Sequence, residues 1–326
     1  MIAQQVISID APAEWKEALN NIKHSFGHTW ENCYAMQLTT GFKTYLYCLK
    51  SEHGHIFCPI SERKYGSYID ILKPFGFCGF VRTGDGDNFL PYWEAFVKKK
   101  GYVCGYLGLD PIFNSGDYFN PEDIYQYDTV HVLDLTIPVD ELFANLSENR
   151  KRQLRNWDRG LSDFVFDRAR LIDFFLSNYL DFFQRINASS YYHFSRETIS
   201  YLFGLENVIL VGAQDKEGNL AAISVFTYTP HVGEYLFNVS LPEGRQFAVP
   251  LIWHGINRLK SLGIPLLNLG GGKHNLFEFK RRFGGRQYAL QGLKQVYKPE
   301  IYQRLCQQAN TDPNDRTGYF PAYRKP

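Results

Sequence analysis

The chain has 326 residues, of which 44% are hydrophobic and 21% are charged, and its formal net charge is +1. This length predicts two domains, and the near-neutral balance excludes a global field that would gather nucleic acid or an anionic membrane surface. No stretch approaches the ~18 uninterrupted apolar residues of a membrane-spanning helix. Six cysteines without a Cys-x-x-Cys pair, and the lack of a signal-peptide pattern, predict reduced thiols and a cytoplasmic location.

The first half of the chain predicts a mixed α+β domain. Apolar residues at helical spacing predict helices, and apolar or alternating runs between turn residues predict strands. The predicted helices are Pro12–Lys23 and Asp87–Lys100. The predicted strands are Cys33–Thr39, Lys43–Leu49, His55–Ser61, Tyr102–Leu109 and Thr129–Leu135. Between them, Pro74–Phe80 interleaves glycine with phenylalanine, which indicates either a cleft wall that contacts substrate or a loop folded onto the core.

The second half repeats this order after a basic helix. Val139–Arg159 is rich in arginine, which indicates a hinge between domains whose charges form either an anion-binding face or a solvated one. The helices that follow are Leu171–Ile186, Ser195–Leu202, Ala248–Leu262 and Pro299–Gln308. The strands are Phe164–Asp167, Val208–Gln214, Leu220–Tyr228, Gly233–Val239, Pro265–Leu269 and Tyr288–Tyr297. We therefore expect domains at residues 1–138 and 139–309, and an extended or disordered tail at 310–326.

The stretch Leu266–Gly285 carries the clearest functional signal. An apolar run ends in three glycines, 270–272, and a basic, aromatic segment follows and closes on two more. Glycine lets the backbone approach a ligand and adopt positive φ, and a cationic loop after a strand can present N–H groups to an anion. The same pattern also suits a turn with a solvated basic loop.

Three segments together resemble the FemAB-like family, the tandem form of the GNAT acyltransferase fold. They are the basic helix Glu148–Asn156, the run Tyr235–Gly272, and Phe279-Lys-Arg-Arg-Phe-Gly-Gly285, which is similar to the family's Phe-Lys…Phe-Gly signature. The resemblance implies a bacterial protein with two GNAT-like domains, each a mixed, mostly antiparallel sheet flanked by helices.

The resemblance also implies an N-acyltransferase that moves an acyl or aminoacyl group from a thioester or a tRNA ester to a small-molecule or peptide amine by direct attack. Acyl-CoA is the implied co-substrate, and aminoacyl-tRNA is the alternative. The near-neutral charge favours the compact CoA, whereas the loop Gly244–Val249 has one glycine at its start and none where GNAT proteins usually hold the pyrophosphate. A second hypothesis is a non-catalytic, degenerate GNAT-fold protein that binds an anionic ligand or a partner.

Acyl transfer requires hydrogen-bond donors for the acyl oxygen, a base, and groups that hold the donor's phosphates. By resemblance, Lys280 steadies the donor or the developing oxyanion. Glu234 and Tyr235 are candidate bases, as are Tyr191 and Tyr192, and each of them also suits a structural role. The residues predicted to hold the donor are Asn238, Val239, Gly244, Arg245, Gln246, Phe247, Ala248, Gly270 and Gly271. The residues predicted to contact the acceptor are Arg150, Arg152, Phe75, Phe77 and Tyr191. His53-Gly-His55 lacks a third ligand at suitable spacing, so no metal site is predicted.

Overall fold

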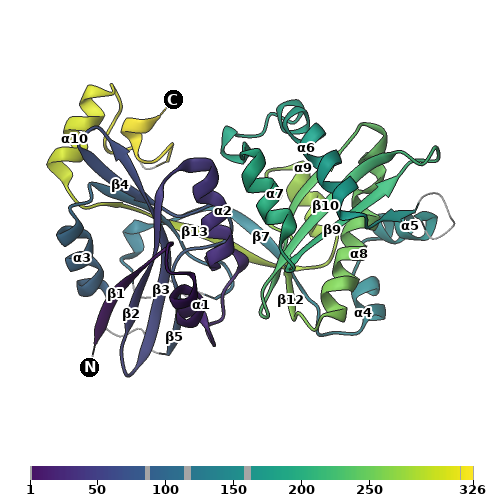
Figure 1. Ribbon diagram of the computed structural model, residues 1–326, viewed down its shortest axis with the longest axis horizontal. Helices are drawn as coiled ribbons and strands as arrows, with labels where there is room; N and C mark the ends of the chain where they lie inside the picture. Colours follow the sequence, from purple (N-terminus) through teal and green to yellow (C-terminus); the bar gives the residue numbers. More distant parts are fainter. Residues whose placement is uncertain (1, 85–88, 114–118, 158–162, 316, 326) are drawn as a thin grey trace. The chain divides into compact units, whose positions relative to one another are not determined.

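The computed structural model describes residues 2–84, 89–113, 119–157, 163–315 and 317–325. The chain divides into two compact units (Figure 1): unit 1 comprises Met1–Tyr127 and Ala289–Pro326, and unit 2 comprises Asp128–Tyr288. It passes between the units within two strands, β7 (Ile124–Asp134) and β13 (Arg286–Val296). Each unit is a mostly antiparallel sheet with helices, which confirms the predicted α+β class.

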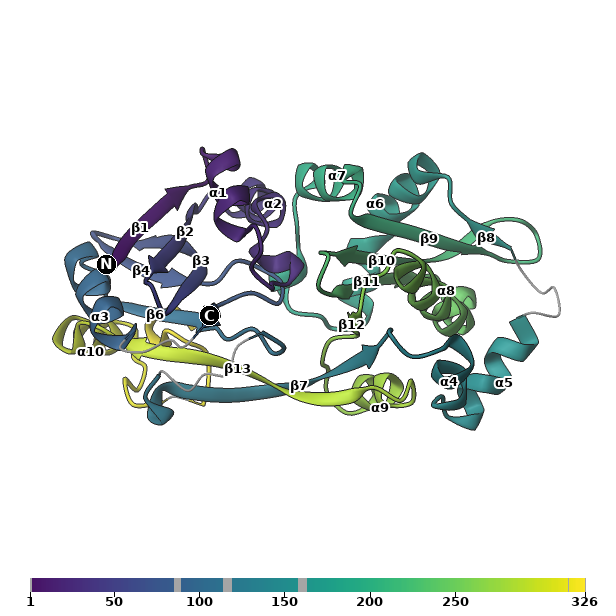
Figure 2. The same ribbon diagram turned by 90° about the horizontal axis from the view of Figure 1, so that it is seen from below.

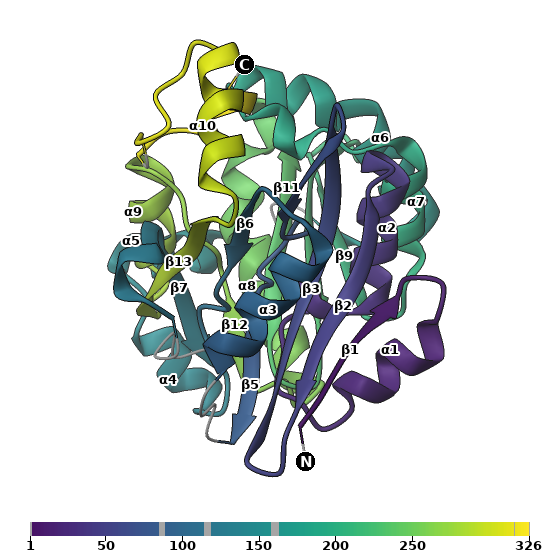
Figure 3. The ribbon, with the colours of Figure 1, turned by 90° about the vertical axis from the view of Figure 1, so that its left-hand side faces the viewer.

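The sheet of unit 1 has the strand order β1-β2-β3-β4-β6-β13, with β5 paired to β3. Besides β13, its strands are β1 (Ala3–Ser8), β2 (Lys43–Lys50), β3 (Gly54–Tyr65), β4 (Tyr68–Leu72), β5 (Val81–Gly84) and β6 (Cys104–Gly108). Its helices are α1 (Pro12–Leu19), α2 (Trp30–Thr40), α3 (Phe89–Lys100) and α10 (Pro299–Gln308). Successive residues of β2 enter two different cores, because Tyr47 packs in the cluster of Trp93 and Cys48 in the cluster of Trp15. Helices α3 and α1 therefore cover opposite faces of this sheet (Figure 3).

The sheet of unit 2 has the strand order β7-β12-β11-β10-β9-β8. Besides β7, its strands are β8 (Phe164–Val165), β9 (Val208–Gln214), β10 (Leu220–Tyr228), β11 (Gly233–Ser240) and β12 (Leu266–Asn268). Its helices are α4 (Val139–Ala144), α5 (Glu148–Trp157), α6 (Arg168–Arg185), α7 (Arg196–Gly204), α8 (Ala248–Ser261) and α9 (Asn275–Arg281). Figure 2 shows α6 and α7 on one face of β9–β11 and α8 on the other. On the α8 face, Phe226 and Leu267 pack against Ile252 and Ile256 in the main core of the unit.

One predicted strand is a helix. Residues 33–39 lie within α2, whose N-cap Thr29 accepts a hydrogen bond from Asn32 N (3.2 Å) and whose C-cap Gly41 has a φ of +63°. These caps favour a helix. The alternating pattern misled the sequence prediction because the buried residues Cys33 and Met36 also share one helical face.

Two further predictions differ in detail. The single helix predicted at 139–159 is two helices, α4 and α5, separated at Ser147, whose N–H donates to Arg282 O; its last two residues lie outside the described part of the chain. The segment 275–281, predicted as a basic loop, forms helix α9. Strands β1, β4 and β5 had no counterpart in the sequence prediction.

The C-terminal segment differs from its prediction most. Strand β13 pairs with β6, so residues 289–326 return to unit 1 and do not complete the second domain. The described residues of the tail are folded: Arg324 Nε and Tyr323 OH donate to the fully buried Asp70 carboxylate at 2.7 and 3.0 Å. A polar tail can order in this way when its partner lies far away in sequence, which its own composition does not reveal.

Candidate functional site

The sheet of unit 2 separates between β11 and β12. Only Gly233 and Glu234 of β11 pair with β12, although β11 continues to Ser240. Among the described residues, no strand pairs with this edge of β11 beyond Glu234. The other edge stays paired with β10, with a register irregularity between Val225 and Phe226. The backbone N–H and C=O groups of every second residue in 235–240 therefore point to an unpaired strand edge. This segment includes the predicted donor residues Asn238 and Val239.

Lys280 approaches this region from α9. Its side chain is 7% exposed, and its Nζ donates to Gly271 O at 2.6 Å and lies 6.0 Å from the centre of the Tyr235 ring. Burial lowers the pKa of Lys280 to about 8, against the opposing effect of the Asp128 carboxylate. Lys280 thus remains mainly an ammonium at neutral pH, held in a low-dielectric setting with further N–H donors beyond the one it uses.

Tyr235 lies on the same face of the sheet as Phe226, at 5.4 Å between ring centres. Burial raises the pKa of its phenol, and a hydrogen bond with Ser224 opposes that shift. Ser224 Oγ and Ile223 O both accept from Asn238 Nδ2, each at 3.1 Å. Tyr235 is therefore a protonated hydrogen-bonding group and is poorly suited to be the base.

Glu234 points the other way. Successive residues of a strand face opposite sides of the sheet. Glu234 stands opposite Thr227 and Asn268 in the strand register and is 1% exposed. The structure therefore brings Lys280, Tyr235 and Gly271 together and leaves Glu234 on the far face.

The glycines after β12 shape the loop that holds Lys280. Gly270 has a φ of +76°, and its N–H donates to Asn268 Oδ1 at 2.8 Å. A methyl group on Gly271 would lie 2.5 Å from Asp128 Oδ2 and 2.9 Å from Thr129 O. Both glycines are thus required by a turn or a close approach within the protein itself.

The segment between β11 and α8 forms a 3₁₀ turn, Glu243–Phe247. Gly244 packs so closely that an added Cβ would lie 2.0 Å from Ala221 O, and Phe247 is buried against Trp157. Arg245 and Gln246 are exposed, and Ala248 begins α8. Of this predicted donor loop, only the Arg245 and Gln246 side chains are exposed, because Ala248 is half-buried and the next two residues of α8 are buried. The positive end of the α8 dipole favours an anion beside these two side chains.

Arg150 is 4% exposed and stacks its guanidinium on Phe279 and Phe283, at 4.2 and 5.4 Å from the ring centres. It donates to Gln153 Oε1 at 2.7 Å and to Phe279 O at 3.3 Å. Burial and the neighbouring charge of Arg282 lower the pKa of Arg150. Arg152 is exposed and donates to Asn149 Oδ1 at 2.9 Å.

The other residues predicted to contact the acceptor belong to segments far from Lys280 in the sequence. Phe75 and Phe77 are half-buried in a loop of unit 1, where Phe75 O accepts from Asn32 Nδ2 at 2.8 Å. Tyr191 is 48% exposed in the short 3₁₀ turn Ser190–Tyr192 of unit 2.

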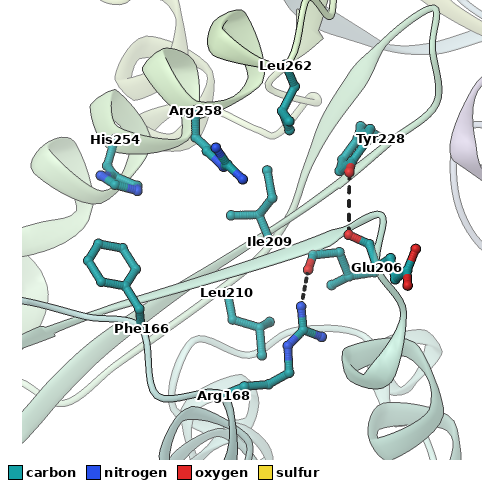
Figure 4. Close-up of a pocket in the computed structure, with 10 residues that line it drawn as sticks. Phe166, Arg168, Glu206, Ile209, Leu210, Tyr228, His254, Arg258 and Leu262 are labelled. Carbon is teal, nitrogen blue, oxygen red and sulfur yellow. Dashed lines mark hydrogen bonds between the residues drawn. The ribbon is translucent and has the colours of Figure 1, made fainter.

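A cavity of about 420 Å³ opens elsewhere in unit 2, beside strand β9 (Figure 4). Arg168 uses its guanidinium on backbone carbonyls, including Val208 O at 2.7 Å. Half-buried His254 lies 5.1 Å from Phe166 between ring centres, and burial, followed by the charge of Arg258, lowers its pKa. Arg168 and Tyr228 in this cavity donate to backbone carbonyls of the protein itself. The polar side chains of the cavity therefore do not point together at one position where a substrate could react.

Sequence reasoning missed two polar residues near Lys280. Asp128 and His131 lie in β7; the first affects the pKa of Lys280 and the second is fully buried. The only available signal was a lone histidine inside the apolar run 130–133. In the described residues there is no cluster of three or more potential metal-ligating side chains, and none of the described helices has the length and apolar character needed to cross a bilayer.

No protein-family model matches this sequence, and a search of curated protein sequences finds no match. Solved structures do match. FemX superimposes with a TM-score of 0.70 at 11% identity, over 93% of this chain and 99% of FemX. A conserved protein of unknown function from Bacteroides thetaiotaomicron VPI-5482 gives 0.60 at 11% identity, over 91% and 100% of the two chains. L-PGS from Bacillus licheniformis gives 0.53 at 12% identity, over 88% and 92%.

Likeness at such low identity establishes fold and not activity. The chain therefore has the tandem GNAT-type fold of FemX and the FemAB-like proteins, which confirms at the level of fold the resemblance predicted from its sequence.

Proposed function

We propose that unit 2 carries an N-acyltransferase centre, which moves an acyl or aminoacyl group from a thioester or a tRNA ester to a small-molecule or peptide amine by direct attack. The observation that carries this proposal is the buried Lys280 ammonium beside the unpaired edge of β11. Negative charge develops on the acyl oxygen during transfer, and a preorganised cation in a dry site stabilises it strongly.

The Lys280 ammonium is positioned before any substrate arrives. Its bond to Gly271 O fixes the direction of Nζ, and two further N–H donors are left for an acyl oxygen. The Lys280 side chain is 7% exposed, so little water reaches it. A fixed donor of this kind is worth about 10²–10³-fold in rate in acyl-transfer enzymes.

Acyl-CoA is the proposed donor, and aminoacyl-tRNA is the alternative. Arg245 and Gln246 would hold phosphate groups, because their side chains are exposed beside the N-terminus of α8. Gly244 would not contribute close backbone contact, since its open side is filled by Ala221 O. The donor supplies the activated acyl group, and this chain's residues orient it and stabilise charge.

The decisive experiment compares Lys280→Ala with Lys216→Ala, which removes an exposed lysine from the turn after β9. Purified full-length protein is assayed with acetyl-CoA and with an aminoacyl-tRNA pool, each against a panel of primary amines. We expect turnover in the wild type and in Lys216→Ala, and a loss of about 10²-fold or more in Lys280→Ala.

The non-catalytic alternative is favoured by one observation: Glu234, the predicted carboxylate base, lies on the far face of the sheet from Lys280. If the wild type binds acyl-CoA or tRNA but turns over neither, the protein is a binding module with this fold. If it neither binds nor turns over either donor, the proposed function is wrong.

A further inference from the structure

His131 is a buried histidine with unused hydrogen-bonding capacity. Its side chain is fully buried in β7, and neither ring nitrogen has a hydrogen-bond partner within the described part of the chain. Buried polar atoms are nearly always paired, because an unpaired one costs free energy, so each exception asks for an explanation. A neutral imidazole with an unused nitrogen can accept a proton.

The backbone places this imidazole beside the glycine loop that holds Lys280. Leu269 N donates to His131 O at 2.8 Å, and His131 N donates to Gly270 O at 3.4 Å. The imidazole meets the Phe277 ring edge-on, at 4.7 Å between centres. Phe277 and Lys280 are three residues apart on α9 and therefore share a helical face.

The charged groups around His131 keep it neutral. Burial, followed by the charges of Lys280 and Arg281, lowers its pKa below the ordinary 6.5, while Asp128 and Glu278 oppose the shift. The other candidate bases are less suitable: Tyr235 holds its proton, Lys280 is itself mainly protonated, and Glu234 faces away.

We propose that His131 is the proton acceptor of the transfer reaction. The inference rests on the function proposed above. The amine nitrogen bonds to the acyl carbon and the acyl–sulfur or acyl–oxygen bond breaks. The proton lost by the amine passes to a ring nitrogen of His131 and then to the departing thiolate or alkoxide. No oxidant or further reactant is needed, and Lys280 keeps its own proton throughout.

The first test is the pH dependence of kcat/KM for wild type and His131→Gln, with acetyl-CoA or aminoacyl-tRNA and the amine that gives most turnover. The wild type should lose activity at acid pH with a midpoint below 6.5, since His131 then becomes protonated. His131→Gln should lose about 10²-fold or more and should lack that acid limb. The control is His254→Gln, which changes a half-buried histidine whose pKa is also lowered and which should keep both rate and profile.

Two measurements separate catalysis from folding. Added imidazole should restore activity to His131→Ala, because small bases enter the vacated space, whereas a purely structural histidine would not be rescued. In ¹⁵N NMR titrations of the full chain without substrate, the pKa of His131 should rise in Lys280→Met, which removes a nearby positive charge.

Each outcome of these measurements bears on a different proposal. A wild type that turns over a donor, with His131→Gln unchanged in rate and profile, overturns this inference and leaves the proposed function standing. An unchanged His131 pKa in Lys280→Met overturns the placement of the imidazole beside the ammonium. A wild type that turns over no donor overturns both proposals.

Discussion

Arg150 and Lys280 are both buried cations of unit 2, one packed against α9 and one within it, yet their neighbours are very different. The Arg150 guanidinium stacks on two rings and donates to Gln153 and to Phe279 O near the end of α9. Carbonyls at a helix C-terminus attract a cation, so this contact stabilises the helix. Within the part of the chain that the structure describes, Lys280 donates one hydrogen bond, to Gly271 O, and its Nζ lies 6.0 Å from the centre of the Tyr235 ring.

The neighbours of the two side chains distinguish a structural cation from a functional one. Burial alone does not distinguish them, because both side chains are less than 10% exposed. What differs is the neighbours: Arg150 is surrounded by rings and a helix end, whereas Lys280 lies near Tyr235 and the unpaired edge of β11. The following predictions test that distinction.

Replacing Lys280 by methionine should have the largest effect, and only on catalysis. We expect kcat to fall about 10²–10³-fold, because the donor to the acyl oxygen is lost. The free energy of unfolding at pH 7 should stay equal or increase, since an apolar chain of similar length replaces a buried charge. Initial rates and urea unfolding measure the two effects, and a large loss of stability would identify Lys280 as structural.

The free energy of unfolding should depend on pH through Lys280. Its folded pKa of about 8 lies below the ordinary 10.5. Between these values the unfolded chain binds more protons, so stability rises with pH, by at most about 3 kcal/mol for a shift of this size. Urea unfolding of wild type and Lys280→Met at pH 7.5 and pH 10 measures it. If the difference between the two proteins is the same at both pH values, the pKa of Lys280 is not lowered.

Replacing Arg150 by methionine should show the reverse pattern. The free energy of unfolding should fall by about 1–3 kcal/mol, because the ring stacking and the hydrogen bond to Phe279 O are lost. The kcat of the protein that remains folded should stay within a few-fold of wild type. Arg150→Lys, which keeps the charge but not the planar stacking, should recover little stability. A strong loss of kcat with unchanged stability would instead place Arg150 in the reaction.

A smaller effect is expected for Gly271→Ala. The new methyl group would meet Asp128 Oδ2 and Thr129 O at less than 3 Å, so the loop must shift. We expect a loss of about 1–3 kcal/mol in the free energy of unfolding, and a moderate fall in kcat because the carbonyl that orients Lys280 moves. Gly204→Ala, where nothing lies within 4 Å of the new methyl group and φ is also ordinary, is the matched control and should lose no stability. A Gly271→Ala protein as stable as Gly204→Ala would show that crowding at Gly271 is unimportant.

Much of the fold could be predicted from the sequence. Long apolar patterns with clear ends, such as α8 and β9–β11, give strong local signals, and the predicted ranges match the structure closely. Short or capped elements were missed, because the caps of α2 and the pairing of β4 with β3 and β6 involve contacts that periodicity does not contain.

The candidate site was predicted in part. The Phe-Lys signature identified Lys280, but the partners that define its chemistry were not visible. Asp128 and His131 precede Lys280 by about 150 residues, and only the pairing of β7 with β12 places them beside its loop. Arg150 was predicted to contact an anionic ligand, and in the structure its donors meet Gln153 and the end of α9; its role toward a ligand stays a prediction.

The sequence by itself determined the local elements, the class of the fold and the one lysine most worth changing, because periodicity, glycine and short motifs are properties of neighbouring residues. The tertiary structure alone shows that β13 returns to unit 1, that Glu234 lies on the far face of the sheet from Lys280, and which buried cation lies beside the unpaired edge of β11. These depend on strand register and on burial, which arise from residues far apart in the chain.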